Sequence, residues 1–249
     1  MAPLRESPPR LSALGRATVL LLAVLLAAFA AGTPPFALSP VDNQVREIRE
    51  RPLLAHTVSG LQVNSSLPLY EFLLSHPDIT AALARAVGAA GYRVSPDGED
   101  GYRGEDGKGA KGHFILVERG EGRRVYLVWG TYDKPLLPTI AGRMVLVLEY
   151  KTNGPADPRV ENRVQGFVRI DNPIVGTLAR IGRPLVKRAM DKKVRHLFDK
   201  VARLLDAASA DPSEALRRLA EDGPRSPQDL ETLRQLLEAE RTRRATAKS

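Results

Sequence analysis

The sequence contains no cysteine among its 249 residues. Disulfide bonds, cysteine nucleophiles, thiolate metal sites and acylation of an N-terminal cysteine are therefore excluded. Hydrophobic residues make up 43% of the chain and charged residues 27%, as in ordinary globular proteins. A chain of this length can bury a substantial core, so we expect a folded protein that is stabilised by packing alone.

Sequence motifs for catalysis and cofactor binding are also missing. The four histidines show no ligand spacing such as His-x₃-His, and no Gly-x-Ser-x-Gly elbow occurs. The stretch around Lys108 lacks the first glycine of a phosphate-binding loop and the Ser or Thr that follows its lysine. The acidic stretch 97–106 fits hairpin turns better than a calcium loop. The sequence predicts no metal, no cofactor and no catalytic residue.

No apolar run reaches the roughly 20 residues that a membrane-spanning helix needs. The longest is the 15-residue run 17–31, which three arginines precede. A basic segment, a short apolar run and the small-x-small pattern at 28–30 are typical of a signal peptide. We expect residues 1–31 to be a signal peptide or, if uncleaved, an N-terminal membrane anchor. The domain would then lie outside the cytoplasm, in the periplasm or cell envelope.

The charge balance is basic, with a formal net charge of +8. Removing residues 1–30 takes away three arginines and one glutamate, so +8 becomes +6. A positive domain suits an anionic partner such as a lipid headgroup. Because export separates the protein from most nucleic acid, we expect no nucleic-acid partner.

The folded part opens with one strand and two short helices. Residues 32–55 are mixed in polarity and indicate a linker, with a helical turn or two near 41–51. A strand is expected at 56–64, although Gly60 disturbs its alternation. Prolines then start two short helices, at 69–74 and 78–87.

A run of strands follows a stretch of tight turns. Residues 96–112 are dense in Gly and Asp, which favours turns between strands. After it, alternation of apolar and polar residues predicts antiparallel strands. These expected strands are 113–119, 124–132, 143–152 and 160–170.

The longest predicted helix follows the last strand. Asn172 is a good N-cap, Gly182 and Pro184 interrupt the helix, and it ends near residue 208. Its apolar residues recur at spacings of three and four, which places them in one stripe. Residues 209–249 form a polar helical appendix with narrow apolar sides, and we expect 211–249 to be dispensable for folding.

This order of elements resembles the helix-grip superfamily, which includes START-like, polyketide cyclase-like and pollen-allergen-like domains (SRPBCC). The likeness covers residues 56–208 and rests on 57–64, 69–78, the turn-rich 91–112, and 163–170 running directly into 171–208. The resemblance implies an α+β fold in which a curved antiparallel sheet of about six strands packs on a long C-terminal amphipathic helix. It also implies a cavity for lipids, sterols or polyketides, and catalysis in only some members.

The chain therefore divides into 1–31 (signal or anchor), 32–55 (linker), 56–208 (helix-grip-like domain) and 209–249 (appendix). Its expected function is to bind a hydrophobic or amphiphilic, lipid-like molecule between the sheet and the last helix. The expected pocket residues are Phe114, Trp129, Tyr132, Val164, Val168, Met190, Val194, Leu197, Val201 and Leu204. The alternative is a non-catalytic envelope protein with a solid core, whose basic surface meets anionic lipid or a protein. A cyclase-like or hydrolase-like enzyme is a third possibility.

Overall fold

The computed structural model describes residues 40–98, 101–133, 139–152, 154, 159–171 and 183–247. The expected signal peptide or anchor at 1–31 lies outside the described residues, as does the expected helix start at Asn172. Among the helices that are described, none is long and apolar enough to cross a membrane.

A single antiparallel sheet of seven strands forms the centre of the fold, with the order β1-β7-β6-β5-β4-β3-β2. The prediction of an α+β fold with a curved antiparallel sheet and a long C-terminal helix is confirmed. The sheet has seven strands where about six were expected. Five of them correspond to the strands predicted by range, and two short ones form within the turn-rich stretch. The strands are β1 (Leu54–Asn64), β2 (Arg93–Pro96), β3 (Gly101–Glu105), β4 (Ala110–Gly120), β5 (Arg123–Tyr132), β6 (Ile140–Thr152) and β7 (Arg159–Ile170).

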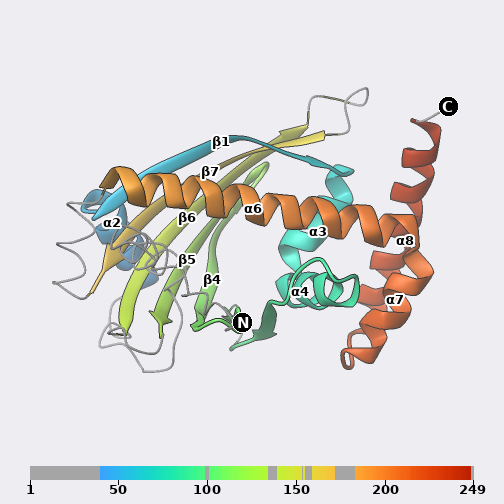
Figure 1. Ribbon diagram of the computed structural model, residues 1–249, viewed down its shortest axis with the longest axis horizontal. Coiled ribbons are helices and arrows are strands. Elements are labelled where there is room, and N and C mark those ends of the chain that lie inside the picture. Colours follow the sequence, from blue (N-terminus) through green and yellow to red (C-terminus); the bar gives the residue numbers. More distant parts are fainter. Residues whose placement is uncertain are drawn as a thin grey trace, which may run out of the picture.

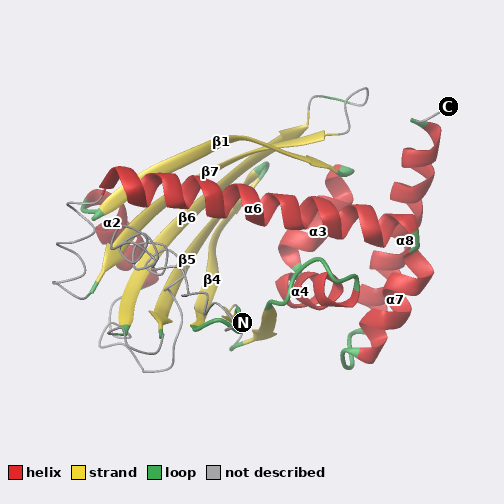
Figure 2. Ribbon diagram, viewed as in Figure 1, coloured by secondary structure: helices red, strands yellow, loops and turns green. Residues whose placement is uncertain are grey.

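Helices precede, interrupt and follow the sheet in the chain, as Figure 2 shows in red. Pro at the first turn starts α3, α4, α7 and α8, where its missing N–H has no helical partner to lose. The helices are α2 (Val41–Glu50), α3 (Leu67–Ser75), α4 (Pro77–Ala86), α6 (Arg183–Ala210), α7 (Pro212–Glu221) and α8 (Pro227–Thr246).

The two faces of the sheet are covered by different helices. Alternate residues of a strand point to opposite faces, and residues paired across neighbouring strands share a face. Helix α2 covers what we call the outer face, where Ile48 packs with Val125 and Val145. Helix α6 crosses the other, inner face (Figure 1), where Met190 lies over Gly166.

Strand β1 bends at Gly60, the residue that disturbs its alternation in the sequence. Its register with β7 shifts between Val58 and Leu61, which marks a β-bulge. Gly60 has a φ of 68°, a conformation that glycine adopts without strain. The bulge lets Val58, Leu61 and Val63 all reach the same buried cluster.

Helices α3, α4, α7 and α8 form a filled core with the end of α6, at one end of the sheet (Figure 1). The narrow apolar sides of α7 and α8 face α4, α3 and α6 instead of solvent. The expectation that residues 211–249 are dispensable for folding therefore needs revision. The fully buried leucines of this core are Leu69, Leu83, Leu204, Leu205, Leu219, Leu233 and Leu237.

A buried carboxylate joins α8 to the start of α3. Glu240 has no exposed surface, and it accepts hydrogen bonds from Arg243, from Arg244 Nε at 2.8 Å and from the Ser66 backbone N–H at 3.0 Å. Burial by itself would raise the pKa of Glu240. The bonds from the two arginines and from Ser66 outweigh burial and lower this pKa to about 2. Glu240 is thus held as an ion at neutral pH.

Candidate ligand-binding site

Helix α6 is fixed over one side of the inner face, above β1 and β7. His56 Nε2 of β1 lies 3.0 Å from Asp191 Oδ1 of α6. A Cβ built on Gly166 would lie 3.4 Å from Met190 Cε, so the absence of a side chain there lets the helix approach the sheet closely. The helix therefore covers the β1 side of the inner face more completely than the β3 and β4 side.

Two apolar rows cross the inner face beneath and beside α6. The strand register places their members opposite one another, so each row points to the same face. The aromatic row consists of Tyr102, Phe114, Val128, Met144, Val168 and Leu54. The middle row consists of Leu116, Tyr126, Leu146, Gly166 and His56.

The rings in these rows contact one another. Phe114 stacks on Tyr102 with ring centroids 5.4 Å apart and meets Tyr126 edge to face at 6.4 Å. Phe114 and Tyr126 are nevertheless only partly buried. These strands thus present an apolar, aromatic surface that the described chain does not fully cover.

A strip without side chains borders the aromatic row. Glycines stand opposite one another in four consecutive strands: Gly104, Gly112, Gly130 and Gly142. Such a strip allows a sheet to bend strongly and allows another group to approach its backbone. Gly104, Gly112 and Gly130 are buried, so other groups do lie close to this strip.

Leu197 is the exposed member of the apolar stripe of α6. Seven residues are almost two helical turns, so Met190, Leu197 and Leu204 lie on nearly the same side of α6. Met190 is 5% exposed and Leu204 is 2% exposed, whereas Leu197 between them is 45% exposed. Val194, Phe198 and Val201 in the same stretch are partly buried and pack against the core. Leu197 is therefore the least buried apolar residue in the middle of α6.

Nine of the ten predicted pocket residues lie on the inner face or on α6. Phe114, Tyr132, Val164 and Val168 point to the inner face, and the stripe residues belong to α6. Trp129 does not lie with them. It points to the outer face, where it packs near α2 and stacks on His113 with ring centroids 5.6 Å apart. Successive residues of a strand point to opposite faces of the sheet, so Trp129 and its neighbour Val128 lie on different faces.

A polar cluster lies where the inner face meets α3. It consists of Tyr70, Glu71, Arg124, Tyr126, Tyr150 and Asn162.

Hydrogen bonds hold most of this polar cluster in place. Tyr70 donates to Asn162 Oδ1 at 2.6 Å, and Tyr150 donates to Glu71 Oε1 at 2.8 Å. Burial raises the pKa of Tyr70, with smaller contributions from the neighbouring tyrosines. Burial also raises the pKa of Tyr150, to about 12, and the bond to Glu71 adds to the rise. Both phenols are therefore neutral donors at physiological pH.

Arg124 is the charged centre of the polar cluster. The residue is only 5% exposed, and its guanidinium lies 5.5 Å from the centre of the Tyr150 ring. Its Nη1 donates to the backbone oxygens of Gly120 at 2.7 Å and Arg123 at 2.9 Å, and its Nη2 lies 3.7 Å from Glu71 Oε1. Its Nε is buried and has no acceptor among the described residues.

Tyr126 connects the polar cluster to the apolar rows. It lies two residues after Arg124 on the same face of β5. Burial raises the pKa of Tyr126, while Arg124 and Arg119 oppose this rise. The sequence indicated Tyr150 only as core or pocket lining, and it did not identify the other cluster residues. The one available signal was that Arg124, Tyr126 and Val128 alternate along β5 and therefore share a face of the sheet.

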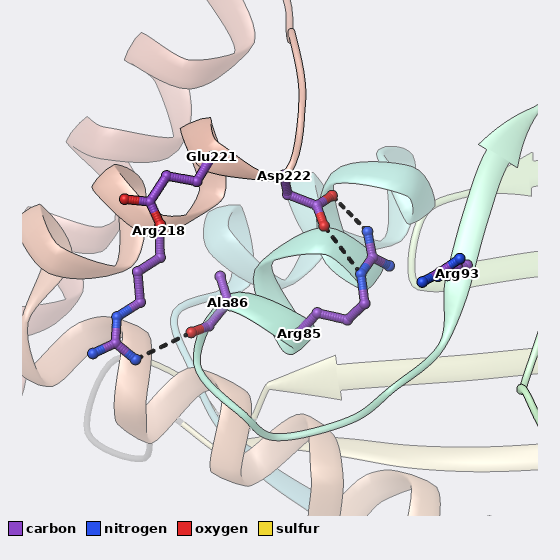
Figure 3. A pocket seen from close by; sticks show the side chains of 6 residues that line it. All are labelled: Arg85, Ala86, Arg93, Arg218, Glu221 and Asp222. Atoms are coloured by element: carbon purple, nitrogen blue, oxygen red, sulfur yellow. Dashed lines mark hydrogen bonds and ion pairs between the residues drawn. The ribbon is translucent and has the colours of Figure 1, made fainter.

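A hollow of about 660 Å³ lies between α4, β2 and α7 (Figure 3). Its lining is polar, and the lining residues bond to one another. Arg85 donates two hydrogen bonds to Asp222, and Arg218 donates to the Ala86 backbone oxygen. Such a lining does not suit a hydrophobic ligand. In the described part of the chain, no three His, Asp or Glu side chains gather as metal ligands.

The comparisons with known proteins give matches in structure alone. No family model and no curated protein sequence matches the chain. A conserved protein from Geobacillus kaustophilus is 13% identical with a TM-score of 0.41, and the match covers 63% of this chain and 95% of that chain. A protein from Thermobifida fusca is 18% identical with a TM-score of 0.30, covering 57% and 89%. A START superfamily protein from Mycobacterium smegmatis is 14% identical with a TM-score of 0.30, covering 58% and 97%.

TM-scores below 0.5 describe a partial likeness in chain path. The helix-grip resemblance is confirmed by this chain's own element order. Strand β1 leads into two short helices, the antiparallel strands follow, and α6 crosses the inner face after β7.

Proposed function

We propose that this chain binds a hydrophobic or amphiphilic, lipid-like molecule between the inner face of the sheet and α6. The exposed Leu197 on the packed side of α6 is the observation that carries the proposal. A non-polar molecule bound between Leu197 and the aromatic row would shield these side chains and itself from water. Burial of apolar ligand surface is favourable by roughly 25 cal/mol per Å².

The arrangement suits an amphiphile better than a simple hydrocarbon. The aromatic and middle rows supply apolar contact, and the polar cluster stands at one end of them. Ligand sites commonly combine an apolar lining with a few fixed polar groups that orient the ligand. We expect the apolar part of the ligand on the rows and its polar end near Tyr126.

Native mass spectrometry of the purified full chain tests this function. The expected result is a mass increment that corresponds to one co-purified lipid-like molecule and that disappears on denaturation. A titration of delipidated protein with a fluorescent fatty acid should then show saturable binding at one site. Protein that carries no such molecule and binds no hydrophobic probe would contradict the proposal.

We further propose that the domain acts outside the cytoplasm, exported or anchored by residues 1–31. The basic segment followed by a short apolar run supports this localisation. An alkaline phosphatase fused after residue 60 should be active, because this enzyme folds only outside the reducing cytoplasm. An inactive phosphatase, together with an active cytoplasmic reporter fused at the same position, would overturn the proposal.

The solvent side of α6 supports a second candidate, attachment to an anionic surface. It carries the exposed Arg188, Lys192, Arg195 and Arg203, and Leu185 among them is 46% exposed. Basic residues around an exposed leucine suit an anionic bilayer surface. Co-sedimentation with vesicles that contain anionic lipid, compared with neutral vesicles, tests it. Equal recovery with both vesicles would contradict this candidate.

A further inference from the structure

The guanidinium of Arg124 is held in one orientation by its Nη1. This nitrogen donates to two backbone oxygens, those of Gly120 and Arg123. The opposite edge of the guanidinium, formed by Nε and Nη2, makes no hydrogen bond to the described residues. Nε is buried without an acceptor, and the nearest oxygen to Nη2 is Glu71 Oε1, at 3.7 Å.

A buried N–H donor without an acceptor is unusual, because most buried polar groups are hydrogen-bonded. The Nε and Nη2 edge of arginine is a planar fork whose two donors fit the two oxygens of a carboxylate. Glu71 does not occupy this fork, since its Oε1 accepts the hydrogen bond from Tyr150 instead. An acceptor from outside the chain would complete the hydrogen bonding of Arg124.

Arg124 lies on the same face of the sheet as the apolar rows. Tyr126 lies two residues along the same face of β5, and its side chain is partly buried. Arg119 stands opposite Arg124 in the β4–β5 register. Two arginines against the single carboxylate of Glu71 give this corner a net positive charge.

Resting on the ligand-binding function proposed above, we infer that Arg124 and Tyr126 bind the carboxylate of an amphiphilic acid. One carboxylate oxygen accepts from Arg124 Nε, the other accepts from Nη2, and Tyr126 donates its hydroxyl to the same group. The alkyl or ring part of the acid lies along the middle row toward Leu146. Glu71 limits affinity, because its charge lies close to Nη2 and repels the incoming carboxylate.

The inference is tested with a matched pair of probes, 11-dansylaminoundecanoic acid and its methyl ester. They share the tail and the fluorophore and differ in the charge of the head. A hydrogen bond to a charged group contributes about 1.5–3 kcal/mol, so the full chain should bind the acid at least about tenfold more tightly than the ester. Two further ligands, dodecyl phosphate and dodecanoic acid, are then compared as competitors that displace the bound acid probe.

Three variants assign this preference to the cluster. Arg124→Gln should abolish the preference for the acid, and Tyr126→Phe should lower the affinity for the acid about threefold or more while leaving the ester unchanged. Glu71→Gln should strengthen binding of the acid alone, since it removes the repulsion. Arg143→Gln is the matched control, because Arg143 is equally buried but lies on the outer face with Glu47 and Asp171.

The outcomes separate the inference from the proposed function. Equal affinity for acid and ester in the unmodified chain would overturn the inference and leave the ligand-binding function standing. Binding of neither probe would overturn both. If Arg124→Gln fails to fold, the inference is judged from the nearly isosteric Tyr126→Phe and Glu71→Gln variants, by their separate effects on the acid and on the ester. Stronger competition by dodecyl phosphate than by dodecanoic acid would overturn the assignment to a carboxylate.

Discussion

Two regions of the molecule, the core around α8 and the surroundings of Leu197 in the middle of α6, are both built from aliphatic and aromatic side chains. In the first, α3, α4, α7 and α8 surround the end of α6, and Leu233 and Leu237 have no exposed surface. In the second, a single helix faces a broad sheet, and Leu197 remains half-exposed. The residue types are similar in both regions. The number of elements that face the apolar surface differs, and this number decides how fully its side chains are buried.

Helix α6 takes part in both regions with one continuous stripe. Leu204 and Leu205 belong to the filled core, and Leu197, almost two turns before Leu204, is 45% exposed. An apolar stripe therefore predicts which side of a helix faces the sheet. Whether the facing space is filled depends on elements elsewhere in the chain, here α7 and α8.

Removal of α7 and α8 should have the largest effect on this comparison. A chain that ends at residue 210 loses Leu219, Leu233 and Leu237 from the core and exposes the surfaces they cover. Each buried leucine contributes about 2–5 kcal/mol, and a small domain is stable by only about 5–15 kcal/mol. We expect cooperative thermal unfolding to be lost. A truncated chain that melts cooperatively at the original temperature would show that the two regions are independent.

Paired alanine substitutions compare the regions directly. Leu233→Ala should lower the free energy of unfolding by about 2–5 kcal/mol, because it leaves a cavity in a filled core. Leu197→Ala should lower it by less than about 1 kcal/mol, because this side chain is already largely exposed. Chemical denaturation of both variants measures the difference. Similar losses in the two variants would mean that the surroundings of Leu197 are as tightly packed as those of Leu233.

Acidification should weaken the filled core through Glu240. Its folded pKa of about 2 lies below the ordinary value of 4.5 that it takes in the unfolded chain. A lowered folded pKa adds stability above pH 4.5, and this contribution is lost as the pH falls from about 4.5 toward 2. Its size at neutral pH is on the order of 3 kcal/mol.

Glu240→Gln checks this expectation when its unfolding is followed from pH 7 to pH 2. The stability difference from the unmodified chain should shrink steadily below pH 4.5. Glu238→Gln on the same helix is the control, because Glu238 is exposed and pairs only at the surface with Arg234. A difference that does not change with pH would mean that the charge of Glu240 contributes nothing.

The sequence was sufficient for the element order because alternation and proline positions are local signals. Strands β2 and β3 were missed since both are short and lie among Gly and Asp residues that favour turns. Trp129 was placed on the wrong face because both faces of β5 are apolar: Val125 and Leu127 on one, Tyr126 and Val128 on the other. Periodicity cannot distinguish two apolar faces.

The polar cluster could not be predicted because it is made by contacts between distant segments. Arg124 on β5 meets Glu71 on α3, and Tyr70 on α3 meets Asn162 on β7. Nothing in the local pattern around Glu71 or Asn162 separates them from solvent-facing polar residues. Burial of α8 was missed for a similar reason, since the partners of its narrow apolar side lie in α3 and α6.

The smallest change in stability, and the sharpest test of the surroundings of Leu197, should come from enlarging a side chain instead of removing one. In a filled core an added ring forces neighbouring side chains apart and costs about 1–3 kcal/mol. Leu197→Trp should cost almost nothing, because Leu197 is already half-exposed. In the proposed site it should lower the affinity for a fluorescent fatty acid about tenfold, because the new ring takes the place of the ligand. Leu204→Trp is the matched control on the same side of α6, where the full cost of overpacking is expected. Thermal unfolding and probe titration are measured for both variants. Equal destabilisation would show that the surroundings of Leu197 are as tightly packed as those of Leu204. A stable Leu197→Trp protein that binds the probe normally would place the ligand elsewhere on the molecule.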